Sequence, residues 1–184
     1  AQSTPRGAGI GWIETAPFAD ITGFSDEREI YDQSVGAAGA ALILLYAHEH
    51  GVHPKALEWA VSVCERLLEV AEEDPDGLRW RMMSDMPFAF TAPNFAHGGA
   101  GVGYFLLQLH RATGEARYLA AARDAARYTL SRATPAGARG RLICHTEEAR
   151  KPIFYLGACH GPAGTGRRST GHSLTFLPPR SVVA

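Results

Sequence analysis

The sequence N-F-A-H-G-G-A-G-V-G, from Asn94 to Gly103, decides the fold because similar stretches recur at a regular spacing. One of them, G-A-C-H-G-P-A-G-T-G, runs from Gly157 to Gly166 and adds a cysteine. A weaker one, S-V-G-A-A-G, begins at Ser34. Their leading glycines, Gly36, Gly98 and Gly161, are separated by 62 and then 63 residues. A repeat of this length indicates one supersecondary unit copied around a ring or along a solenoid.

Other landmarks keep the same register. His48 precedes His110 by 62 residues, Gly51 precedes Gly114 by 63, and Gly77 precedes Gly140 by 63. Each unit therefore reads as a glycine-rich turn, an apolar helix, a short turn, an amphipathic helix and a long loop, which together form a helical hairpin. We expect inner helices at 35–50 and 98–112, outer helices at 54–73 and 115–132, and few strands. The predicted fold class is all-α.

The apolar pattern distinguishes inner from outer helices. Residues 40–45 read A-A-L-I-L-L, which is apolar nearly all round and typical of a helix buried on most sides. The segment 54–73 instead carries one apolar stripe, formed by Leu57, Val61, Cys64, Leu68 and Ala71, with glutamates on the other face. Cys64 is therefore expected to be a core residue.

Composition excludes several classes of function. A formal net charge of −1 and a pI near 6.8 argue against nucleic acid or an anionic membrane as the main partner. No apolar run reaches the roughly 18 residues of a membrane span, and no signal peptide is recognised at the N-terminus. Three widely spaced cysteines suit reduced thiols or a metal ligand better than disulfides. We expect a cytoplasmic protein.

The repeat is expected to break after Gly166. In the register of the preceding inner helix, the next apolar positions are taken by arginine, serine, threonine and histidine, which cannot bury a helix face. We therefore predict a helical domain over 1–166 and an unstructured tail over 167–184. The chain begins on alanine and inside a repeat, so we expect a piece of a longer protein.

Three segments resemble the lanthionine synthetase C-like family. They are F-A-H-G-G-A-G-V-G-Y-F-L-L from Phe95, T-G-E-A-R-Y-L from Thr113, and C-H-G-P-A-G-T-G-R from Cys159. The resemblance covers about Gly9 to Arg167. It implies an α/α toroid of inner and outer helices, of which this chain would be a part, with one zinc ion at an end of the barrel. It also implies a cyclase activity, in which a cysteine thiol of a peptide adds to a dehydrated serine or threonine and closes a thioether ring. The expected partners are such a peptide and the dehydratase that prepares it.

The implied chemistry suggests roles for three residues. Addition of a thiol to an activated alkene requires the thiolate, and zinc binding deprotonates a thiol. Cys159 and His160 are the expected zinc ligands, and His97 is the expected acid that protonates the enolate carbon after attack. All three should lie at one end of the partial barrel, together with Gly36.

One departure from the family pattern concerns the third zinc ligand. The family has another cysteine in a neighbouring repeat, whereas Ala96 stands at the matching position before His97. Cys144 or His145 could replace it only if the loop over 134–158 folds back. With two ligands, we expect the chain to bind zinc weakly and to be inactive, and a longer chain with a further cysteine-bearing repeat to bind zinc tightly.

Other interpretations stay open at this stage. Cys159 and His160 could be a buried thiol beside a turn histidine, and His97 could cap the following helix. The chain could be a catalytically inactive toroid fragment that binds a peptide or a partner protein. It could also be a carbohydrate-active α/α toroid, which needs paired carboxylates. The loops offer Asp26, Glu27, Asp85, Glu147 and Glu148, without any fixed pairing motif.

Overall fold

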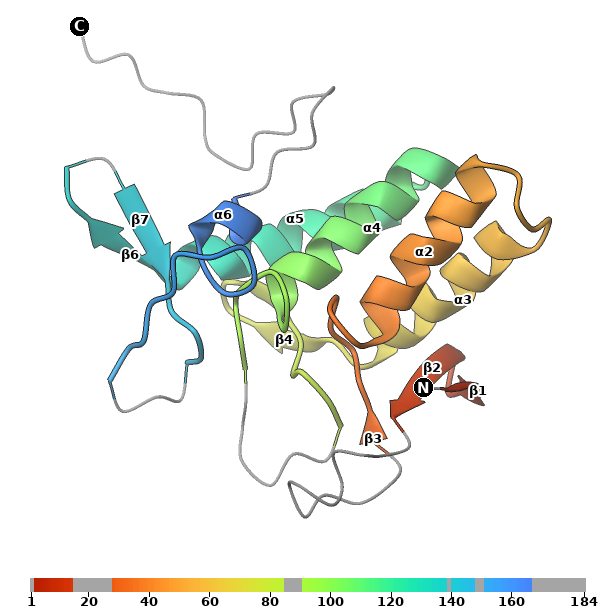
Figure 1. The fold of residues 1–184 in the computed structure, drawn as a ribbon, viewed down its shortest axis with the longest axis horizontal. Helices are drawn as coiled ribbons and strands as arrows, with labels where there is room; N and C mark the ends of the chain where they lie inside the picture. Colours follow the sequence, from red (N-terminus) through yellow and green to blue (C-terminus); the bar gives the residue numbers. More distant parts are fainter. Residues whose placement is uncertain (1, 15–27, 85–90, 139, 148–150, 167–184) are drawn as a thin grey trace, which may run out of the picture.

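A computed structural model of the chain describes residues 2–14, 28–84, 91–138, 140–147 and 151–166. Its main helices are α2 (Ala37–Glu49), α3 (Ala56–Glu69), α4 (Gly99–Thr113) and α5 (Ala116–Ser131). Helices α2 and α3 form one antiparallel hairpin and α4 and α5 a second, and α2 packs beside α4 (Figure 1). The four helices expected from the repeat are therefore present, and the largest difference in bounds is at the end of α3.

The expected all-α class is wrong for the connecting segments, which form antiparallel strands. A three-stranded sheet has the order β1 (Gln2–Arg6), β2 (Gly9–Glu14), β3 (Arg28–Glu29). Two hairpins follow the outer helices: β4 (Glu72–Asp74) with β5 (Gly77–Arg79), and β6 (Ala133–Ala136) with β7 (Gly140–Ile143). The turn between β4 and β5 ends at Gly77, whose φ of 143° a side chain would strain. Strand β4 replaces the predicted last turn of α3.

The core lies between the inner and outer helices. Its fully buried members include Val63, Cys64 and Leu67 of α3, and Phe105, Leu106 and Leu109 of α4. Trp80 closes one end and donates its indole N–H to the Leu67 carbonyl at 2.7 Å. The prediction that Cys64 is a core residue is confirmed, and burial raises the pKa of its thiol to about 12.

The three glycine-rich turns stack on one another at one end of the helices. The N–H groups of Gln33 and Ser34 donate to the Ala96 carbonyl at 3.2 and 3.1 Å, and the Ala96 N–H donates to the Cys159 carbonyl at 2.8 Å. Ser34, Ala96 and Cys159 occupy equivalent positions of successive repeats, so the hydrogen bonds between the turns join equivalent residues. Helix α6 (Pro162–Thr165) then begins where a third inner helix would start. The predicted tail over 167–184 lies outside the described residues.

Candidate functional site

The turn before α2 places a buried carboxylate at this end of the molecule. The Asp32 side chain is 0% exposed, and its Oδ1 accepts the N–H groups of Val35 at 2.8 Å and Gly36 at 3.0 Å. Two bonds hold the preceding residues in place: Arg66 of α3 forms an ion pair with Glu29 at 2.8 Å, and the Tyr31 N–H donates to the carbonyl of Met82. These contacts fix the Asp32 carboxylate independently of its contact with the next repeat.

The second oxygen of this carboxylate reaches His97. Asp32 Oδ2 lies 2.7 Å from His97 Nδ1, and the two residues are 65 positions apart in the sequence. A carboxylate only accepts hydrogen bonds, so it selects the form of the ring that carries a proton on Nδ1. The imidazole is 23% exposed, so it can exchange protons beyond the pair. A buried carboxylate that orients a partly exposed imidazole is a common arrangement for acid and base catalysis.

Two more histidines gather around His97. The His160 ring centroid lies 5.0 Å from that of His97 and 4.3 Å from that of His145. Tyr155 is next to both, with its ring 5.3 Å from His160 and 5.2 Å from His145. We name His97, His145 and His160 the histidine cluster. It combines the turn before α4, the segment after β7 and the turn before α6.

The surroundings favour the neutral form of two of these rings. Burial, and then the neighbouring imidazoles His145 and His97, lower the pKa of His160. Burial, and then His97, lower the pKa of His145. A neutral imidazole can bind a metal or accept a proton, whereas a protonated ring can do neither. The cluster thus combines one carboxylate-bound ring with two rings that favour neutrality.

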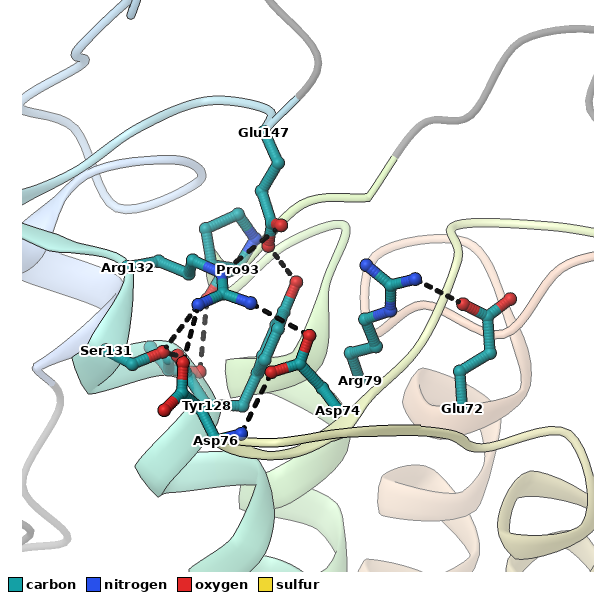
Figure 2. A network of polar contacts seen from close by, with 10 residues as sticks. Glu72, Asp74, Asp76, Arg79, Pro93, Tyr128, Ser131, Arg132 and Glu147 are labelled. Carbon is teal, nitrogen blue, oxygen red and sulfur yellow. Dashed lines mark hydrogen bonds and ion pairs between the residues drawn. The ribbon is translucent and has the colours of Figure 1, made fainter.

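The segment that carries His145 is fastened to the rest of the structure by ion pairs. Figure 2 shows Arg132, at the end of α5, between Glu147 and the two aspartates of the β4–β5 hairpin. Its guanidinium lies 2.8 Å from Asp76, 2.9 Å from Asp74 and 3.3 Å from Glu147. Tyr128 also donates its hydroxyl to Glu147. Residues 144–147 of this loop therefore lie folded back at the site, which was the condition for Cys144 or His145 to replace the third zinc ligand.

The structure places one of the two expected zinc ligands, His160, beside the expected acid, His97. His160 lies in the histidine cluster, Cys159 precedes it, and the Cys159 side chain is exposed at this end. Cys144 instead pairs with Phe154 in an antiparallel bridge. A thiol and an imidazole that favours neutrality are chemically suitable types of zinc ligand. Within the described ranges, however, no group of three His, Cys, Asp or Glu side chains is placed to surround one ion. The chemistry of the pair fits zinc, but the described residues do not form a complete site.

Sequence reasoning missed Asp32. The signal that could have found it is the repeat itself, because Asp32 stands four residues before Gly36 as Asn94 stands four before Gly98. A polar side chain at the same position of two repeats indicates a shared role in the turn.

The carboxylates expected of a carbohydrate-active enzyme find little support. Asp26, Glu27, Asp85 and Glu148 lie outside the described residues, and Glu147 is bound to Arg132 and Tyr128. A carboxylate in an ion pair with arginine is poorly suited to act as the general acid of a glycosidase, because the arginine favours its ionised form.

No helix in the described ranges combines the length and the apolar composition needed to cross a membrane.

Comparison with known proteins agrees with the geometry. The sequence model of the family described as lanthionine synthetase C-like protein matches residues 17–168, which is most of the chain. No curated protein and no solved structure matches. The match covers the repeated helical hairpins, the Asp32–His97 pair and the Cys159–His160 turn. The chain therefore belongs to the lanthionine synthetase C-like family.

Proposed function

We propose that this protein adds cysteine thiols to dehydroamino acids in peptides, with His97 as the acid of the reaction. The observation that carries the proposal is the 2.7 Å contact between the buried Asp32 carboxylate and His97 Nδ1, beside the Cys159–His160 turn. Family membership supports the class of reaction, and the contact supports the role of the residue.

The bond changes are those of a conjugate addition. The sulfur of the thiolate attacks the β-carbon of the dehydroamino acid, and the electron pair of the double bond moves toward the α-carbon and its carbonyl. Protonated His97 then donates the proton on Nε2 to the α-carbon. Asp32 stabilises the positive charge on the ring before this transfer and keeps the Nδ1 proton in place after it. The thiol proton leaves to solvent, and His97 regains a proton from solvent.

Zinc is the proposed cofactor, with Cys159 and His160 as two of its ligands. When bound, zinc would lower the pKa of a substrate thiol so that the thiolate forms at neutral pH. The donor pair suits the ion, and a third protein ligand has to come from outside the described residues. We therefore expect this chain to show the reaction only with zinc in large excess, and to be inactive with one equivalent.

The physiological substrate would be a peptide that carries both a dehydrated serine or threonine and a cysteine. A dehydratase partner has to supply such a substrate, because nothing in the proposed reaction removes water. A cytoplasmic location is part of the same proposal, since reduced thiols persist there.

The test uses a synthetic peptide with one dehydroalanine and one cysteine. Ring closure consumes the free thiol without a change in mass, so thiol labelling followed by mass spectrometry measures it. With excess zinc, the chain should close the ring faster than zinc alone, and Cys159→Ala should remove this acceleration. A rate equal to that of zinc alone would contradict the proposed function. Arg123→Ala, at an exposed position on α5, is the control for handling and folding.

An inactive fragment that only binds peptides is the second candidate. The observation that favours it is the lack of three closely placed metal-binding side chains in the described ranges. It predicts that the same peptide binds without any loss of its thiol.

A further inference from the structure

Equivalent positions of two repeats carry side chains that act in the same way. Asp32 and Asn94 each stand four residues before the leading glycine of their turn. One atom of each side chain caps its own turn: Asp32 Oδ1 accepts the Val35 N–H at 2.8 Å, and Asn94 Oδ1 accepts the His97 N–H at 3.2 Å. The other atom of each reaches a segment later in the chain.

The forward contacts both end at the histidine cluster. Asp32 Oδ2 meets the ring of His97 at 2.7 Å, while Asn94 Nδ2 donates to the backbone carbonyl of His145 at 2.9 Å. The Asn94 side chain is fully buried, so loss of either of its two hydrogen bonds would lower the free energy of unfolding substantially. In the third turn, Gly157 occupies the equivalent position and has no side chain to reach forward.

The bond from Asn94 fixes the backbone that carries the His145 ring. The His145 N–H donates to the Ile153 carbonyl at 2.8 Å, so both sides of this residue are hydrogen-bonded. Two residues later, the Glu147 N–H donates to the carbonyl of Thr91 at 3.1 Å. With the backbone of residues 145–147 held at these points, the position of the His145 ring is set by its side-chain torsions.

We propose that Asn94 is a positioning residue that holds His145 in the reacting site, as Asp32 holds His97. His145 is then a further residue of the site, in contact with the substrate peptide beside His160. The inference deepens the proposed function and rests on it, because His145 serves the reaction only if thiol addition takes place at this cluster.

The structural arm of the test uses the fact that Asn94 is the only asparagine in the chain. In protein labelled on asparagine, its side-chain amide gives one pair of NMR signals. These should exchange slowly with solvent and show a through-space contact to His145. Fast exchange without that contact would overturn the inference in the unaltered protein, so this arm does not depend on any variant folding.

Substitution of Asn94 by aspartate separates its two bonds. Asn94→Asp keeps the acceptor for the His97 N–H but replaces the donor to His145 with an oxygen that repels the carbonyl. The contact between the His145 and His160 rings should weaken, and that between His97 and His160 should stay. Thr129→Val is the matched control, because it removes a buried hydroxyl that bonds the Pro93 carbonyl beside Asn94. Unchanged ring contacts in Asn94→Asp would overturn the inference.

The functional arm is a double-mutant cycle in the thiol-addition assay with excess zinc. We expect His145→Ala and Asn94→Asp each to lower kcat/KM about tenfold or more, and the double variant to be no slower than His145→Ala alone. Fully additive losses would mean that Asn94 acts independently of His145, and would overturn the inference. Full activity in His145→Ala, with activity lost in His97→Ala, would overturn this inference and leave the proposed function standing. No activity in the unaltered protein would count against the proposed function, while the NMR result would still decide the role of Asn94 in positioning.

Discussion

Replacement of Asp32 should separate its structural role from its chemical role. Asp32→Ala removes two bonds that cap the turn and the bond to His97, whereas Asp32→Asn keeps an oxygen for the cap and loses the charge that faces the ring. We therefore expect the alanine variant to unfold much more easily, and the asparagine variant to fold well and react slowly.

The magnitudes follow from the contacts. A hydrogen bond to a charged group contributes about 1.5–3 kcal/mol, and a buried donor left without a partner costs about 1–3 kcal/mol. The two cap bonds share one acceptor oxygen, so their contributions do not simply add. We therefore expect Asp32→Ala to lower the free energy of unfolding by roughly 3–5 kcal/mol. Asp32→Asn should lower it by roughly 1–2 kcal/mol, since the two cap bonds remain as weaker, neutral bonds and the contact with His97 loses its charge.

Urea unfolding at neutral pH, followed by far-ultraviolet circular dichroism, measures both values. Asp124→Ala is the control. Asp124 forms an ion pair with Arg127 on the exposed face of α5, so its loss should lower the free energy of unfolding by less than about 1 kcal/mol. Equal losses for Asp32→Ala and Asp32→Asn would refute the reasoning, since the cap would then contribute nothing.

Four further predictions concern the metal, the cysteines and the loop that carries His145. Zinc should bind weakly in competition with a chelator; stoichiometric zinc retained at nanomolar free metal, and lost on Cys159→Ala, would show a complete ligand set in this chain. Iodoacetamide should modify Cys159 long before Cys64, and peptide mapping that finds equal rates would contradict the burial of Cys64. Because burial raises the pKa of the Cys64 thiol from 9.0 to about 12, the unfolded thiol ionises first, so this residue makes the free energy of unfolding fall as pH rises above 9. The slope should reach about 1.4 kcal/mol per pH unit and be absent in Cys64→Ala. Finally, Arg132→Met should speed amide hydrogen exchange over 144–147, with exchange in α2 unchanged; equal protection in both proteins would show that the Arg132 ion pairs do not hold this loop.

The repeat register predicted much of the architecture. Apolar periodicity depends on local geometry, so the four main helices and their pairing were predictable from a single sequence. The same register predicted that His97, Cys159 and His160 lie at one end, because equivalent turns of a repeat stack on one another. The hydrogen bond from Ala96 to Cys159 shows that stacking directly.

The rest depended on contacts that no local pattern encodes. The β4–β5 hairpin has a recognisable Asp-Pro-Asp-Gly turn, but its strands are too short for a period to be seen. The return of His145 to the site depends on Arg132, which joins acidic residues from two separate loops. The partner of His97 was missed because Asp32 is 65 residues away, and only the comparison of repeats relates the two turns.

The most direct test of the central claim is the rate of thiol addition by His97→Ala in the presence of excess zinc. General acid catalysis contributes about a hundredfold or more, so the rate should fall by at least that factor while zinc binding and the circular dichroism spectrum stay unchanged. His110→Ala, which alters a half-buried histidine at the far end of α4, should react like the unaltered protein. A His97→Ala protein that closes the peptide ring at the full rate would contradict the claim that the Asp32–His97 pair delivers the proton.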